Sequence, residues 1–147
     1  MEEKYQSLAC FKTRCLGCFK IVEIPIVSDF MYGSFLFQTN DGQDFYYANL
    51  LDVKAFHFIQ AEIERIPLIK KKSAFKVLSL VADQPQGKRF TPNYPVCPRC
   101  QTRLLFHSND ESKKTGVRYF KYATWKKFES LSDEEKLERI KNALNIR

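Results

Sequence analysis

Four cysteines stand in two Cys-x-x-Cys pairs, and this residue type at this spacing is suited to holding a metal ion. The first pair is Cys15 and Cys18, and the second pair is Cys97 and Cys100. Two intervening residues let the chain turn tightly enough for both sulfurs to reach one ion, and two such turns supply four tetrahedral ligands. A shell of four thiolates leaves no position for water, so the sequence predicts one structural Zn²⁺ ion per chain.

Other uses of these cysteines stay open. Iron could occupy a rubredoxin-like site with the same ligands, the pairs could be redox dithiols, or all four could be buried thiols without a metal. Redox chemistry is less well supported, because thioredoxin-like chemistry expects a βαβ unit and a plain strand is expected after Cys18. The fifth cysteine, Cys10, is interpreted as a small buried residue, although Cys10 or His107 could substitute as a ligand.

The two pairs resemble the metal-binding knuckles of the zinc-ribbon group. Cys97-Pro98-Arg99-Cys100 matches the usual Cys-Pro-x-Cys form, and the resemblance implies a β-hairpin after it, which fits strands expected at Thr102 to His107 and Val117 to Tyr122. One feature departs from the group: glycine commonly follows the second cysteine of a knuckle, whereas Phe19 and Gln101 stand at these places. The resemblance covers only the knuckles and this hairpin, and it points to no particular family.

Motifs that mark common enzyme sites are absent from the sequence. It contains no Gly-x-Gly-x-x-Gly or Gly-x-x-x-x-Gly-Lys nucleotide loop, no His-Glu-x-x-His and no Gly-x-Ser-x-Gly. Neither His57 nor His107 lies in the His-x-Glu motif of zinc deaminases, and two isolated histidines are too few for a histidine-framed nuclease. We therefore expect a non-enzymatic binding module, and no residue is assigned a catalytic role.

The net charge of +7 is unevenly distributed along the chain. From Leu68 to Lys127 there are 14 lysines and arginines against three acidic residues, whereas from Ile21 to Ile66 there are two against seven. A basic second half attracts polyanions, and aromatic residues interleaved with it, such as Tyr119, could stack on bases. The sequence therefore predicts DNA or RNA binding. The candidate nucleic-acid-binding residues are Lys70, Lys71, Lys72, Lys88, Arg89, Arg103, Lys113, Lys114, Arg118 and Lys121.

A protein-interaction module is the alternative function. A basic field also attracts acidic protein surfaces, so a zinc-stabilised adaptor, or an inhibitor of the immunity-protein type, fits the same composition. The chain begins without the basic and apolar order of a secretory signal, and no run reaches the roughly 18–20 apolar residues of a membrane span. We therefore expect a cytoplasmic protein, in which paired cysteines favour metal binding over disulfides. The oligomeric state is left open.

The elements that must position the cysteines form an α+β pattern with small antiparallel sheets. Strands are expected at Phe19 to Val27, Ser34 to Thr39 and Asp44 to Tyr47. The last two are joined by Asn40-Asp41-Gly42-Gln43, in which Asp-Gly is a strong turn signal. We therefore expect these two strands to form a hairpin.

One mid-chain helix is expected after the hairpin. Apolar residues recur at helical spacing from Val53 to Ile66, and either Asn49 or Asp52 is a plausible cap for this helix. The next segment, Ser73 to Ala82, suits a strand and a buried helix equally well.

Two C-terminal helices complete the expected fold. A short helix is expected at residues 124–131, and Ser132-Asp133-Glu134-Glu135 is a capping box that begins the last helix. The length fits a single domain of residues 1–147. In this domain, residues 19–96 form a long insertion between the two knuckles.

Overall fold

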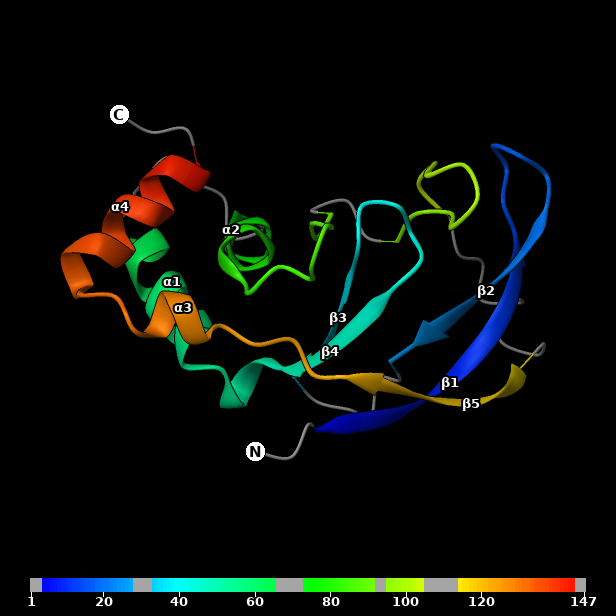
Figure 1. Ribbon diagram of the computed structural model, residues 1–147, viewed down its shortest axis with the longest axis horizontal. Helices are drawn as coiled ribbons and strands as arrows, with labels where there is room; N and C mark the ends of the chain where they lie inside the picture. The colour runs from blue at the N-terminus through cyan, green and yellow to red at the C-terminus, as the bar shows by residue number, and fades with distance from the viewer. Residues whose placement is uncertain (1–3, 28–32, 66–72, 92–94, 105–113, 145–147) are drawn as a thin grey trace.

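The structure is a computed structural model that describes residues 4–27, 33–65, 73–91, 95–104 and 114–144 (Figure 1). A three-stranded antiparallel sheet lies at one end of the molecule, helices gather at the other end, and a two-stranded hairpin lies between them. This arrangement confirms the α+β class with small antiparallel sheets, a mid-chain helix and C-terminal helices.

The three-stranded sheet has the first strand of the chain at its centre. Its order is β2 (Ile21–Ile26), β1 (Tyr5–Arg14) and β5 (Lys114–Lys121), and both neighbouring pairs are antiparallel. The strand expected after Cys18 is confirmed as β2. No strand is expected from the sequence at residues 5–14, although β1 pairs with both other strands of the sheet.

The second sheet is the predicted hairpin. β3 (Ser34–Gln38) pairs antiparallel with β4 (Phe45–Asn49). In the turn, Gly42 has a φ of 78°, a conformation that glycine adopts without steric cost. The Thr39 hydroxyl donates to Asp41 Oδ1 at 2.6 Å. Local turn chemistry therefore fixes the hairpin, as the Asp-Gly pair predicts.

A short 3-10 helix precedes the mid-chain helix. The side chain of Asn49 caps this helix, η1 (Leu50–Asp52), and α1 (Lys54–Glu64) begins after Val53 without a side-chain cap. The prediction that Asn49 or Asp52 caps the long helix is therefore wrong, because the chain makes an extra turn between the strand and α1. The apolar stripe of α1 faces the core as predicted, and its buried residues are Ala55, Ile59 and Ile63.

The ambiguous segment Ser73 to Ala82 is helical, as α2 (Ser73–Val81). The two predicted C-terminal helices are confirmed as α3 (Lys126–Glu129) and α4 (Asp133–Ala143). The capping box at Ser132 is present, since its hydroxyl and the Glu135 carboxylate each bind the other residue's amide. The side chains that these helices bury include Val77, Leu78, Val81, Phe128 and Ile140.

The hairpin expected after the second cysteine pair does not form among the described residues. β5, predicted as its return strand, pairs with β1 and lies at the edge of the three-stranded sheet. Arg103 forms only an isolated bridge with Val96, and residues 105–107 lie outside the described residues. The ten-residue β1 offers β5 a long ladder of backbone hydrogen bonds, and this explains why the N-terminal strand is the partner.

Three clusters of buried side chains join these elements. The largest lies among the helices and includes Trp125 and, from the hairpin, Phe37. A second lies between the hairpin and the three-stranded sheet and includes Leu36. The third surrounds the cysteines and includes Ile24. Because adjacent strand residues point to opposite faces, Phe37 and Leu36 place the hairpin in two clusters at once.

Candidate metal centre

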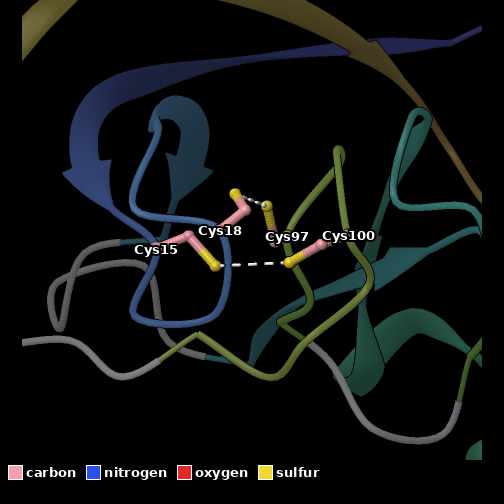
Figure 2. Close-up of side chains that lie close together, drawn as sticks. All are labelled: Cys15, Cys18, Cys97 and Cys100. Atoms are coloured by element: carbon pink, nitrogen blue, oxygen red, sulfur yellow. Dashed lines mark hydrogen bonds between the residues drawn. The ribbon is translucent and has the colours of Figure 1, made fainter.

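The structure brings the four predicted cysteines together. Cys15 and Cys18 lie in the loop that joins β1 to β2, and Cys97 and Cys100 lie in the segment between α2 and β5. All four sulfurs lie within 4.8 Å of one another. Figure 2 shows the two loops facing each other, with Cys15 Sγ 3.5 Å from Cys100 Sγ and Cys18 Sγ 3.8 Å from Cys97 Sγ.

The Cys15–Cys100 and Cys18–Cys97 sulfur distances are close to those of a tetrahedral metal shell. A zinc–sulfur bond of about 2.3 Å in a regular tetrahedron separates the sulfurs by about 3.8 Å. Cys15 and Cys97 are fully buried, and Cys18 and Cys100 are partly buried. The site can therefore hold one metal ion that is enclosed on one side by the protein core.

The two knuckles have the same backbone structure. In each, the amide of the first cysteine donates to the carbonyl five residues later, at 3.0 Å from Cys15 and 2.8 Å from Cys97. The amide after the second cysteine donates to the carbonyl of the first at 2.9 Å in both loops. The amide two residues after the first cysteine points to its sulfur at 3.3 Å, again in both loops. This repeat shows that the two cysteine pairs lie on equivalent turns.

The residues in the place of the knuckle glycine keep the glycine conformation. Phe19 has a φ of 62° and Gln101 a φ of 59°, and among the described residues no other non-glycine residue has a positive φ. A side chain in this left-handed region costs roughly 1–2 kcal/mol. Phe19 and Gln101 therefore adopt the left-handed conformation that a glycine at these positions would supply.

The β3–β4 hairpin holds the second knuckle in place. The side chain of Gln38, which is fully buried, donates to the Val96 carbonyl and accepts from the Val96 amide, both at 2.8 Å. The same side chain donates to the Gly42 carbonyl at 3.0 Å. A Cβ at Gly42 would lie 2.8 Å from Pro98 Cα and 2.9 Å from the Cys97 carbonyl. The segment between the knuckles therefore positions the site directly.

The cysteines of the second knuckle have opposite pKa shifts. Burial raises the pKa of the Cys97 thiol to about 11. The Thr102 hydroxyl lies 3.2 Å from Cys100 Sγ, and its hydrogen bond to the thiolate lowers the pKa of Cys100 to about 6. Because the thiolate is the form that binds a metal ion, the raised pKa of Cys97 opposes metal binding and the lowered pKa of Cys100 favours it.

The other candidate ligands lie away from the cluster or outside the described residues. Cys10 is buried in β1 with its sulfur 3.9 Å from the Leu8 carbonyl, and burial raises the pKa of its thiol. Its position supports the interpretation as a small core residue. The Nε2 atom of His57 is hydrogen-bonded to the Leu51 carbonyl oxygen at 2.8 Å. His107 lies outside the described residues.

Two of the predicted nucleic-acid-binding cations form ion pairs. Lys88 Nζ lies 2.6 Å from an Asp44 oxygen and 2.9 Å from an Asp41 oxygen, and these carboxylates raise the pKa of Lys88. The Thr39 hydroxyl and Lys88 in turn hold the pKa of Asp41 at about 2. Arg118 Nη1 lies 3.6 Å from Glu23 Oε1 of β2, and its guanidinium lies above the ring of Phe120.

The other predicted cations do not form one continuous group in the described structure. Arg89, Arg103 and Lys121 are exposed and belong to separate segments. The backbone of Lys114 begins β5. The remaining predicted residues, Lys70, Lys71, Lys72 and Lys113, lie outside the described residues.

Comparison with known proteins gives no match, because no family model, curated protein or solved structure is significantly similar to this chain. The similarity to zinc ribbons therefore rests on the two knuckles alone. Among the described residues, no helix combines the length and the apolar character needed to cross a membrane.

Proposed function

We propose that this protein is a non-enzymatic module that is stabilised by zinc and binds single-stranded nucleic acid. Zinc is the metal that the donor set favours, because four thiolates at tetrahedral spacing suit Zn²⁺ and leave no position for water or substrate. Iron would use the same ligands, and the metal content of the purified protein distinguishes the two. In either case the metal has a structural role.

The observation that carries nucleic-acid binding is an exposed face of the three-stranded sheet. Residues opposite each other in an antiparallel ladder point to the same face. Lys121 lies opposite Tyr5 in the pairing of β5 with β1. Two residues along, Tyr119 lies opposite Ser7. Two tyrosines and a lysine thus share one face, on which Tyr119 is 74% exposed.

This face, Tyr5, Tyr119 and Lys121, has the chemistry of a stacking platform. Every base has a π-face, so exposed rings bind single strands with little sequence preference, at about 1–3 kcal/mol per stacked base. Cations such as Lys121 neutralise phosphates. The exposed Arg89 and Arg103, together with the net charge of +7, supply further attraction for a polyanion.

The test is binding of a short fluorescein-labelled oligothymidylate, measured by fluorescence anisotropy over a series of salt concentrations. We expect binding at low salt that weakens steeply as salt is added. Tyr119→Ala should weaken it by about tenfold, since one stacked base is lost, whereas Tyr119→Phe should retain most of the affinity. Lys121→Gln should reduce the slope of log affinity against log salt by about 0.7.

Leu80→Ala serves as the control, because it removes an exposed apolar side chain from α2, on the helical part of the molecule. It should leave the oligonucleotide affinity unchanged. Absence of binding at low salt, or equal affinities for the wild type and Tyr119→Ala, would exclude this function.

A further inference from the structure

The residues in the glycine place of the two knuckles differ in what their side chains do. Gln101 Nε2 donates to the Asp41 carbonyl at 3.1 Å and approaches the Pro98 carbonyl at 3.4 Å. These bonds attach the second knuckle to the hairpin turn. They offset the cost of the positive φ, so the fold itself explains why a side chain is present at Gln101.

Phe19 has no equivalent explanation. Its ring is 66% exposed, and among the described residues it stacks on no other ring and lies under no cation. Glycine would make the same turn without the steric cost. Backbone strain that the fold does not require is found at functional sites. Phe19 therefore combines a positive φ with an exposed ring. Both features reduce stability, and no contact among the described residues offsets them.

The apolar neighbours of Phe19 are exposed as well. Leu16 is 61% exposed on the same knuckle, and Ile21, the first residue of β2, is 54% exposed. Three large apolar side chains exposed within six residues of chain are typical of an interaction site rather than of single scattered residues. We call Leu16, Phe19 and Ile21 the knuckle knob. Two of its residues lie on a loop that a metal ion bound by Cys15 and Cys18 would hold rigid, and a rigid apolar anchor loses little entropy on binding.

The two knuckles also carry exposed cations. Lys20 lies within the knuckle knob in the sequence, and Arg99 lies at the tip of the second knuckle; both are exposed. The ion pairs among the described residues involve other cations, namely Arg65, Lys88 and Arg118. Arg14 also lies beside the knob, because its guanidinium donates to the Phe19 carbonyl at 2.9 Å. A partner surface that complements the knuckle knob would therefore have an apolar centre with acidic residues around it.

We propose that the knuckle knob is the docking surface for a protein partner that presents apolar side chains ringed by aspartate and glutamate. Only Phe19 of the three has a π-face on which a base could stack, whereas Leu16 and Ile21 offer apolar surface alone, so this surface suits protein side chains better than nucleic acid. The stacking platform of Tyr5, Tyr119 and Lys121 differs, because it consists of two aromatic rings and a cation and contains no aliphatic side chain. This docking function goes beyond nucleic-acid binding and does not depend on it.

The experiment uses a short fluorescein-labelled peptide in which leucine and phenylalanine alternate with aspartate and glutamate. Its anisotropy is measured with the metal-loaded wild type and with Phe19→Gly, which removes the ring and keeps the turn. We expect Phe19→Gly to weaken peptide binding at least about tenfold, the effect typical of a central interface residue. The thermal midpoint of Phe19→Gly should stay equal or rise, because the positive φ no longer carries a side chain.

Gln101→Gly is the matched control, because it makes the same change at the equivalent position of the second knuckle. It should leave peptide binding unchanged and should not raise the thermal midpoint, because two hydrogen bonds are lost. Peptides with lysine in place of the acidic residues, or serine in place of the apolar ones, should not bind. No binding of the acidic peptide, equal binding by Phe19→Gly, or a loss of oligothymidylate binding in that variant would overturn the proposal.

Discussion

The Thr102 hydroxyl lies against Cys100, one of the four candidate metal ligands, and this contact predicts a pH dependence of metal release. This hydroxyl stabilises the Cys100 thiolate and lowers the pKa of that thiol to about 6. Thr102→Val keeps the shape of the side chain but removes this bond, so the pKa of Cys100 rises and protons compete better with the metal. The metal should therefore be released at a higher pH.

The expected shift follows from the number of protons taken up. A hydrogen bond to a charged group contributes about 1.5–3 kcal/mol, or roughly one pKa unit or more. Because release protonates four sulfurs, the pH of half-release should rise by about 0.3 units, followed with a chromophoric chelator. Thr115→Val, which removes a hydroxyl from β5, is the control. A midpoint in Thr102→Val equal to or below that of the wild type would contradict this role for Thr102.

Residue type and spacing are enough to predict the four cysteines as a group, because a metal site requires particular ligand atoms at a particular separation. The side chains that support the site follow from no such rule. Gln38 acts on residues 58 positions away, and its place is set by tertiary packing. An uncharged polar residue directly after the apolar residues of β3 is the local signal in the sequence. Similarly, the left-handed backbone of Phe19 runs against the preference of that residue.

At the level of elements, the turn of the β3–β4 hairpin lies so close to the second knuckle that little change is tolerated there. Gly42→Ala adds a Cβ at positive φ and places it 2.8 Å from Pro98 Cα. We expect a loss of about 2–4 kcal/mol in the free energy of unfolding, from the conformational cost and the overlap together. Metal affinity should fall as well, because the contact lies on the backbone of Cys97.

Gly87→Ala separates these two causes. Gly87 also has a positive φ, 74°, but a Cβ there would meet no atom within 4 Å. It should therefore cost only about 1 kcal/mol and leave metal affinity unchanged. Chemical denaturation of both variants gives the comparison. Equal losses of unfolding free energy in Gly42→Ala and Gly87→Ala would mean that a Cβ at Gly42 does not overlap the second knuckle.

Elements defined by local signals are predicted well from the sequence, whereas their pairing is not. The Asp-Gly turn, the stripe of α1 and the capping box of α4 each depend on nearby residues. The pairing of β5 with β1 joins residues more than 100 positions apart, and nothing local distinguishes that partner from Thr102 to Leu104. In β1, buried and exposed residues alternate only weakly, because half-buried positions interrupt the pattern.

At the scale of the whole molecule, the four-cysteine site closes a long loop of chain that contains the β3–β4 hairpin. Cys18 and Cys97 are 79 residues apart, and the hairpin between them contributes side chains to the helical core and to the sheet core. Phe37 packs toward Trp125, with ring centroids 5.4 Å apart, and Leu36 packs toward the sheet. A change at the metal should therefore reach the helical end through the hairpin.

Removing the metal should for this reason unfold the molecule as one unit. The purified protein should contain one zinc per chain, and chelation, or Cys97→Ser, should lower the thermal midpoint by more than about 10 °C, because metal-binding free energy is part of folding free energy. Trp125 is the single tryptophan and is buried, so its fluorescence reports on the helical core. Its transition should coincide with the loss of sheet signal in circular dichroism, and Cys10→Ser should retain the metal. Two separate transitions would show that the knuckle end and the helical end are independent units.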